Sequence, residues 1–101
     1  MKLDELIDRI SVVRTRANLS ARKLSQNIGK TDSYIHHMEQ TRKFAPSFAT
    51  LCDILEVCGS SFEEFFYHDI AAYKQDQEIL TLLRAVSPEK RSLCLQLLKV
   101  K

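Results

Sequence analysis

Apolar residues recur at steps of three and four along most of this chain, and only two glycines and two prolines interrupt it. Such steps place side chains on one face of an α-helix, whose period is 3.6 residues. So few turn-forming residues leave little room for the many tight turns of an all-β fold. With 45% apolar and 28% charged residues, the 101 residues suit one modest hydrophobic core. The sequence therefore predicts an all-α protein.

The first predicted helix covers about residues 3–17. Asn18 tolerates the left-handed backbone conformation and is a plausible stop for this helix. Arg9 and Arg16 fall mostly outside the apolar face. That face is formed by Leu3, Leu6, Ile7, Ile10, Val13 and Ala17.

Two shorter helices should follow, separated by a sharp turn. Ser20 is a typical N-cap for a helix over 21–28, and Gly29 can adopt the backbone angles that a turn after it needs. Thr31 is expected to cap the next helix, over about 32–40, with Asp32 in its first turn. If Ile35 points inward, Met38 and Glu39 lie near the same side. The outward and flanking positions then belong to Ser33, Tyr34, His36, His37 and Gln40.

A fourth helix should start at Ser47 and end at Gly59, and Ser61 with Glu64 forms a capping-box pattern for a fifth. The residues that the fourth helix is expected to bury are Phe48, Leu51, Ile54 and Leu55. The fifth carries Phe62, Phe65 and Phe66.

Residues 71–101 predict a separate helical hairpin. One helix should cover about 72–86, and "SPEK" is a strong start signal for a second, with Ser87 as cap and Pro88 at the first helical position. Two helices this apolar need cover, either from residues 1–70 or from a second copy of the chain. As a dimerisation element, the hairpin would use Leu82, Leu83, Val86, Leu93, Leu97 and Leu98.

Several classes of function find little support in the sequence. It contains no glycine-rich phosphate loop, nucleophile elbow or set of ligands with metal-site spacing, so we expect neither an enzyme nor a metal or other cofactor. The three cysteines, Cys52, Cys58 and Cys94, form no C-x-x-C pair and are expected to be reduced thiols. No apolar run approaches the roughly 18 residues of a membrane span, and no targeting signal is visible. The cytoplasm is the expected location.

Charge is segregated along the chain. Residues 1–46 hold nine Lys or Arg and five Asp or Glu, whereas 47–70 hold five acids and no Lys or Arg. A basic N-terminal segment followed by an acidic segment suggests a surface for an anionic partner, although such segregation of charge is also common on solvated surfaces.

Two short helices joined by a turn at glycine, the second of them exposed, make a helix-turn-helix. The run "LSARKLSQNIGKTDSYIHHMEQTRKFAPSFATLCDILEVCGSSFEEFF" resembles the Cro and lambda-repressor type of helix-turn-helix, the XRE family. The resemblance covers roughly residues 5 to 67. Its motifs are Leu19-Ser20, Leu24-Ser25, Ile28-Gly29, Thr31 to Ile35, Met38-Glu39, Arg42-Lys43, Pro46-Ser47 and Val57 to Ser60.

This resemblance implies a five-helix lambda-repressor-like DNA-binding domain over 1–70, followed by two additional helices. The helix over 32–40 would be the recognition helix, lying in the major groove of double-stranded DNA. Arg14 would pair with Glu39 as a structural strut. The base-reading positions implied are Asp32, Ser33 and His37, with Tyr34 and His36 at the edge of the groove. The positions expected at the phosphates are Ser20, Arg22, Lys23, Lys30, Thr31, Arg42 and Lys43.

The recognition helix departs from the commonest pattern. Arg, Lys, Asn and Gln make paired contacts to a base edge, and none of them stands at 32, 33 or 37. Its polar stripe could also be an ordinary solvent-facing surface, and Tyr34 could pack against Phe44. The expected function is a sequence-specific transcriptional regulator, a repressor acting as a homodimer on a two-fold symmetric operator. The alternative is an antitoxin-like or anti-repressor-like protein-interaction module that keeps the fold without binding DNA. Because imidazole ordinarily titrates near pH 6.5, DNA binding through His36 and His37 should tighten between pH 8 and pH 6.

Overall fold

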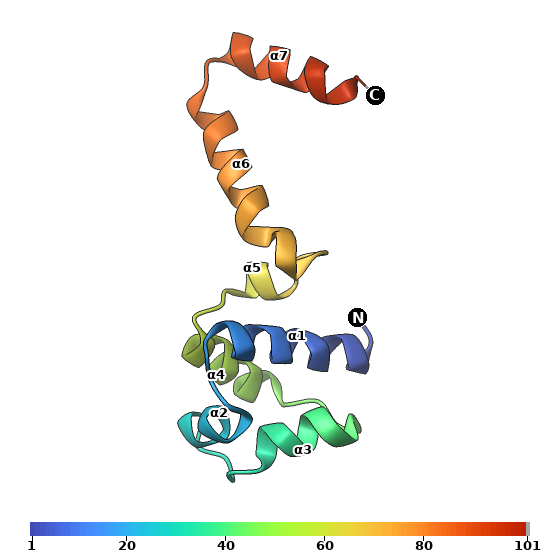
Figure 1. Cartoon of the computed structure of the whole chain (residues 1–101), viewed down its shortest axis with the longest axis vertical. Coiled ribbons are helices and arrows are strands. Elements are labelled where there is room, and N and C mark those ends of the chain that lie inside the picture. Colours follow the sequence, from blue (N-terminus) through green and yellow to red (C-terminus); the bar gives the residue numbers. More distant parts are fainter. Residues whose placement is uncertain (101) are drawn as a thin grey trace. The chain divides into compact units, whose positions relative to one another are not determined.

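A computed structural model describes residues 1–100, and within that range all regular structure is helical, as the sequence predicts. Contacts divide the chain into two compact units, one of residues 1–70 and one that begins at residue 71. The helices, labelled in Figure 1, are α1 (Leu3–Arg16), α2 (Ala21–Asn27), α3 (Tyr34–Thr41), α4 (Phe48–Cys58), α5 (Phe62–Phe65), the 3-10 helix η1 (Ile70–Ala72), α6 (Tyr73–Ala85) and α7 (Pro88–Lys99).

The first unit is built around one hydrophobic core to which α1 to α5 all contribute. Helix α2 packs against α3, and α1 packs against both α3 and α4. Figure 1 shows α2 and α3 on one side of α1 and α5 on the other. The core side chains come from every helix of the unit, which makes it a single folding body. They are Ile7, Ile10, Val13, Leu24, Ile35, Met38, Leu51, Ile54, Leu55 and Phe65.

Helix ends follow the capping residues closely. Ser20, Ser47 and Ser61 each accept a backbone N–H from the first turn of the helix that follows, as the sequence predicts. Asn18 at φ 58° and Gly29 at φ +73° supply the left-handed residues after α1 and α2. These two residues set the short connections that bring α2 back against α3.

The start of α3 differs from the sequence prediction. The helix begins at Tyr34, so Thr31 is not its cap, and Asp32 lies in the turn before it. The carbonyl of Thr31 accepts the Tyr34 N–H at 3.0 Å, which closes this turn. Ser33 stands at the N-cap position without a side-chain cap bond. The cap comes instead from Ser25 in α2, whose buried Oγ accepts the Ile35 N–H at 3.0 Å.

Phe48 is not buried, contrary to the prediction from helical periodicity. Its side chain is 73% exposed, and its ring stacks on that of Phe62 at 5.7 Å between centroids. Phe48 is the first residue of α4, and it lies one turn before Leu51, the first residue of this helix in the hydrophobic core. The periodicity predicts the correct face of the helix, but the core does not reach its first turn.

Arg9 is buried, although it falls mostly outside the apolar face of the helix. Its side chain donates to the carbonyl oxygen of Phe65 at 2.7 Å and also to that of Tyr67. Helix α5 has only four residues, so the carbonyls at its C-terminal end lack partners within the helix. Arg9 satisfies these carbonyls from α1, while Arg16 donates to the carbonyl of Ile70 at 3.2 Å. These two arginines therefore fasten the end of the first unit to α1.

The second unit contains α6 and α7, joined at Ser87, which caps α7 through the Lys90 N–H. The Arg91 guanidinium donates to the carbonyls of Leu83 and Arg84 and so braces the connection. Between residues 71 and 100 no side chain is buried. No helix among the described residues has both the length and the apolar character that crossing a membrane requires.

Candidate nucleic-acid interface

Helix α3 shows two chemically distinct faces. Ile35 and Met38 have no solvent exposure and anchor it in the core. The opposite face exposes His36, His37 and Gln40, and Ser33 is exposed just before the helix. The side chains proposed to read bases are therefore accessible within the first unit, except for Tyr34, which is half-buried. A polar, outward face on a helix held firmly from beneath is suited to contact another molecule.

An ion pair braces α3 from below. Arg14 Nε donates to Glu39 Oε1 at 2.8 Å, and Arg14 Nη2 donates to Oε2 at 3.0 Å. Such a bidentate arrangement fixes both side chains in one geometry. Ser11 donates to the same carboxylate at 3.0 Å, and Arg14 Nη1 donates to the carbonyl of Leu19 at 2.9 Å. This cluster joins α1, α3 and the connection before α2.

An aromatic column lies along the flank of α3. The rings of Tyr34 and Phe44 lie 5.8 Å apart, and those of His37 and Phe44 lie 5.6 Å apart. The ammonium of Lys30 sits over the Tyr34 ring at 5.4 Å, within cation–π range. Burial raises the pKa of the Tyr34 hydroxyl. Tyr34 thus has a packing role on the loop that follows α3.

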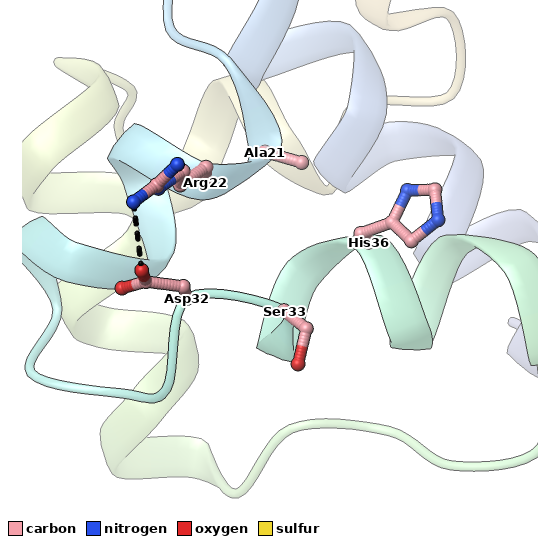
Figure 2. Close-up of a pocket in the computed structure, with 5 residues that line it drawn as sticks. All are labelled: Ala21, Arg22, Asp32, Ser33 and His36. Carbon is pink, nitrogen blue, oxygen red and sulfur yellow. Dashed lines mark ion pairs between the residues drawn. The ribbon is translucent and has the colours of Figure 1, made fainter.

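An open hollow lies between the start of α2 and the turn into α3. It is lined by Ala21, Arg22, Asp32, Ser33 and His36. Figure 2 shows the Arg22 and Asp32 side chains facing each other, Arg22 from α2 and Asp32 from the turn. Arg22 Nη2 lies 3.2 Å from Asp32 Oδ2, and Gln26 Nε2 donates to Asp32 Oδ1 at 3.2 Å. Both oxygens of this carboxylate therefore have partners on α2.

Arg42 and Lys43 are neighbours in sequence, but their surroundings differ. Arg42 ends α3 in the left-handed conformation, and its guanidinium contacts Asp4 Oδ1 at 2.7 Å and Asp8 Oδ1 at 2.6 Å. Two side-chain hydrogen bonds, the one to Asp4 with the larger effect and the one to Asp8, raise the pKa of the Arg42 guanidinium above its ordinary value. In contrast, among residues 1–100 no carboxylate lies within ion-pair distance of the ammonium groups of three exposed lysines. These are Lys23, Lys30 and Lys43.

Four residues at or below this surface have structural roles that the sequence analysis did not assign. Asp4 and Asp8 lie four residues apart on α1, so they share one helical face. This spacing is a signal in the sequence from which a shared partner could have been predicted. Ser25 and Gln26 gave no comparable signal. Their contacts depend on how α2 and the turn after it come together in three dimensions.

A helix-turn-helix family model (HTH_3) matches residues 10–65, which is more than half of the chain. The chain belongs to the Cro/C1-type helix-turn-helix family. No curated protein and no solved structure matches it. In the helix-turn-helix, α2 is the first helix of the motif and α3 is the second, the recognition helix. The family is a DNA-binding regulatory domain and not an enzyme family, so this chain is a DNA-binding helix-turn-helix regulator with the lambda-repressor-like all-α fold.

Proposed function

We propose that this helix-turn-helix regulator binds double-stranded DNA sequence-specifically and represses transcription as a dimer. The observation that carries this proposal is the outward polar face of α3, held by Ser25 and by the Arg14–Glu39 pair. A recognition helix inserted in the major groove presents its N-terminal residues to the base edges. Ser33, His36 and His37 occupy that part of the surface and are proposed to face the bases.

Binding to phosphates is proposed to depend on the exposed lysines around α3. Lys23 and Lys30 lie on or just after α2, and Lys43 follows α3. Ser20 and Thr31 add hydroxyl groups close to the same surface. Counterion release gives a slope of log K against log salt of about −0.9 per neutralised phosphate. Three lysines without a carboxylate partner thus correspond to a slope of about −2.7 for each protomer.

Dimerisation is proposed to use the second unit. Leu82, Leu93, Leu97 and Leu98 are 62%, 59%, 72% and 74% exposed, and Leu83 and Val86 are only half-buried. About 30 residues that bury no side chain lack the core needed to hold two helices together. A second copy of the chain would cover these leucines and create the two-fold axis. Half-sites on the operator would then lie about 34 Å apart, which is one helical turn.

The test is a selection from random duplexes with the purified chain. The expected result is an enriched two-fold symmetric sequence whose half-sites are separated by about 10 base pairs. Binding of the selected duplex should weaken log-linearly with salt concentration. Failure to enrich any sequence, combined with salt-independent or absent duplex binding, would contradict the proposal.

One observation favours a second function, a protein-interaction module that has kept the fold without binding DNA. The described α3 carries no Lys or Arg, and its base-facing side chains make few paired contacts. Under this alternative, the selection fails and the chain instead co-purifies with one partner protein. The selection, together with an analysis of proteins that co-purify with the chain, therefore separates the two functions.

A further inference from the structure

None of the proposed base-facing side chains at α3 can make two hydrogen bonds to one base edge at the same time. Each good paired contact to a base edge comes from a side chain with two suitably spaced hydrogen-bonding groups. Ser33 offers a single hydroxyl, and each of the two histidines offers one ring nitrogen at a time. However, a guanidinium stands at the N-terminal end of α3, supplied by Arg22 of the neighbouring helix.

The Arg22 side chain is exposed but held in place. It retains 72% of its accessible surface, and its Nη2 lies 3.2 Å from Asp32 Oδ2. Asp32 is itself held by Gln26, which lies four residues after Arg22 on the same helix. Among the described residues, no hydrogen bond involves Arg22 Nε or Nη1. The ion pair thus orients one end of the guanidinium, and Nε and Nη1 remain available to another partner.

We propose that Arg22 reads a guanine in the major groove and that Asp32 is the positioning residue that aims it. This inference rests on the proposed DNA-binding function. Arginine makes two hydrogen bonds to the O6 and N7 atoms of guanine, and this is the commonest specific contact of the major groove. The open hollow beside the pair, whose lining includes Ala21 and His36, gives a base edge room to approach.

The charge of the pair favours a base contact over a phosphate contact. A phosphate contact gains affinity from an uncompensated positive charge and the counterion that it releases. Arg22 and Asp32 together have no net charge, so they offer little of this attraction. Hydrogen bonding to the edge of a base depends on the orientation of the donor and not on net charge. Asp32 supplies this orientation for the Arg22 guanidinium.

The pair also contributes little as a structural element. Arg22 and Asp32 are 72% and 57% exposed, and exposed ion pairs stabilise proteins only weakly. Substitutions at either position should therefore leave the fold intact. Urea denaturation of each variant checks this before DNA binding is compared.

The experiment begins with the duplex selected by the wild-type chain and compares Arg22→Ala, Arg22→Lys and Asp32→Asn. Arg22→Ala should lose about 5- to 150-fold in discrimination at one guanine per half-site. Because this variant leaves the charge of Asp32 uncompensated, the slope against salt is compared in the double variant Arg22→Ala with Asp32→Asn, where it should stay unchanged. Arg22→Lys keeps the charge but not the planar fork, so it should lose much of the same discrimination. Asp32→Asn should lower discrimination at that same guanine while its binding to random duplex does not weaken.

Two controls sharpen the comparison. Replacing that guanine by 7-deazaguanine removes the N7 acceptor, so wild-type binding should weaken and Arg22→Ala binding should not. Lys23→Ala is the matched phosphate control on the same helix, and it should weaken all duplexes alike and lower the magnitude of the slope by about 0.9.

If the double variant Arg22→Ala with Asp32→Asn bound all duplexes equally more weakly, with a slope change of about 0.9, Arg22 would be assigned to a phosphate and the inference would be overturned. A selected operator with no guanine whose replacement depends on Arg22 would also overturn it, although DNA binding itself would stand. If the wild-type chain binds no duplex, the proposed function fails, and this inference fails with it.

Discussion

The hydroxyl oxygen of Ser25 accepts the backbone N–H of Ile35 at 3.0 Å, and the Ser25 hydroxyl donates to the carbonyl of Ala21 at 2.7 Å. Ser25 has no solvent exposure. It therefore ties the first turn of the recognition helix to the helix before it. Since Ser33 makes no side-chain cap bond, this link between helices replaces the local cap that most helices use.

Replacing Ser25 by alanine should destabilise the first unit by about 1–3 kcal/mol, because it leaves the buried N–H of Ile35 without an acceptor. Urea denaturation followed by circular dichroism measures this change. Ser33→Ala is the control, since Ser33 is exposed, and it should change stability by no more than about 0.5 kcal/mol. Equal stability of the two variants would contradict this account of the cap.

Breaking the pair between Arg14 and Glu39 should be costly. Their side chains are 16% and 14% exposed, and removal of one partner from a buried pair costs about 3–5 kcal/mol. We expect Arg14→Ala to fall near 3 kcal/mol, the lower end, because both groups keep some contact with water. Arg16→Ala on the same helix removes one exposed hydrogen bond and should cost less than about 1 kcal/mol. If Arg14→Ala lowered the free energy of unfolding as little as Arg16→Ala does, the structural role of the Arg14–Glu39 pair would be refuted.

Arg42 should contribute little to phosphate binding, because Asp4 and Asp8 already hold its guanidinium. Lys43→Ala should reduce the magnitude of the salt slope by about 0.9, whereas Arg42→Ala should leave it nearly unchanged. Replacing both acids by asparagine should release Arg42, steepen the slope by about 0.9 and tighten binding at low salt. The measurement is the dissociation constant at several salt concentrations. Equal slope changes for Arg42→Ala and Lys43→Ala would show that Arg42 leaves its acids when DNA binds.

The leucines of α7 should control the oligomeric state. Leu97→Glu with Leu98→Glu places two charges on the surface proposed to meet a second copy, where burial of unpaired charge is strongly unfavourable. Sedimentation equilibrium should show a dimer for the wild type and a monomer for this variant. Because Lys99 ends the same helix and is exposed and already charged, Lys99→Glu serves as the charge control and should remain dimeric. A wild-type chain that is monomeric at all concentrations would refute the proposed dimer.

Local signals predicted most of the helices. The helix-capping residues Ser20, Ser47, Ser61 and Ser87 predicted four starts correctly, because a cap acts on the residues next to it. The same type of signal wrongly predicted Thr31 as the cap of α3, because that cap comes from another helix. The predicted burial of Phe48 was also wrong, because periodicity gives the inward face of a helix and not how far the core extends along it.

The candidate site was partly predictable. Family resemblance located α3 and its outward face, because that pattern depends on spacing along one segment. It gave no indication that Asp32 would be engaged by Arg22 and Gln26, or Arg42 by Asp4 and Asp8. These partners lie between 6 and 38 residues away in sequence, so only the folded chain brings them together.

Arg9 and Arg16 fasten the backbone up to Ile70, so the place where the chain leaves the first unit is fixed against α1. If the second unit forms the dimer as proposed, choice of half-site and distance between half-sites are separable properties of this regulator. The first would be encoded before Ile70 and the second in the residues after it. Evolution or design could thus retune how far apart two recognition helices stand without altering the sequence that either one reads.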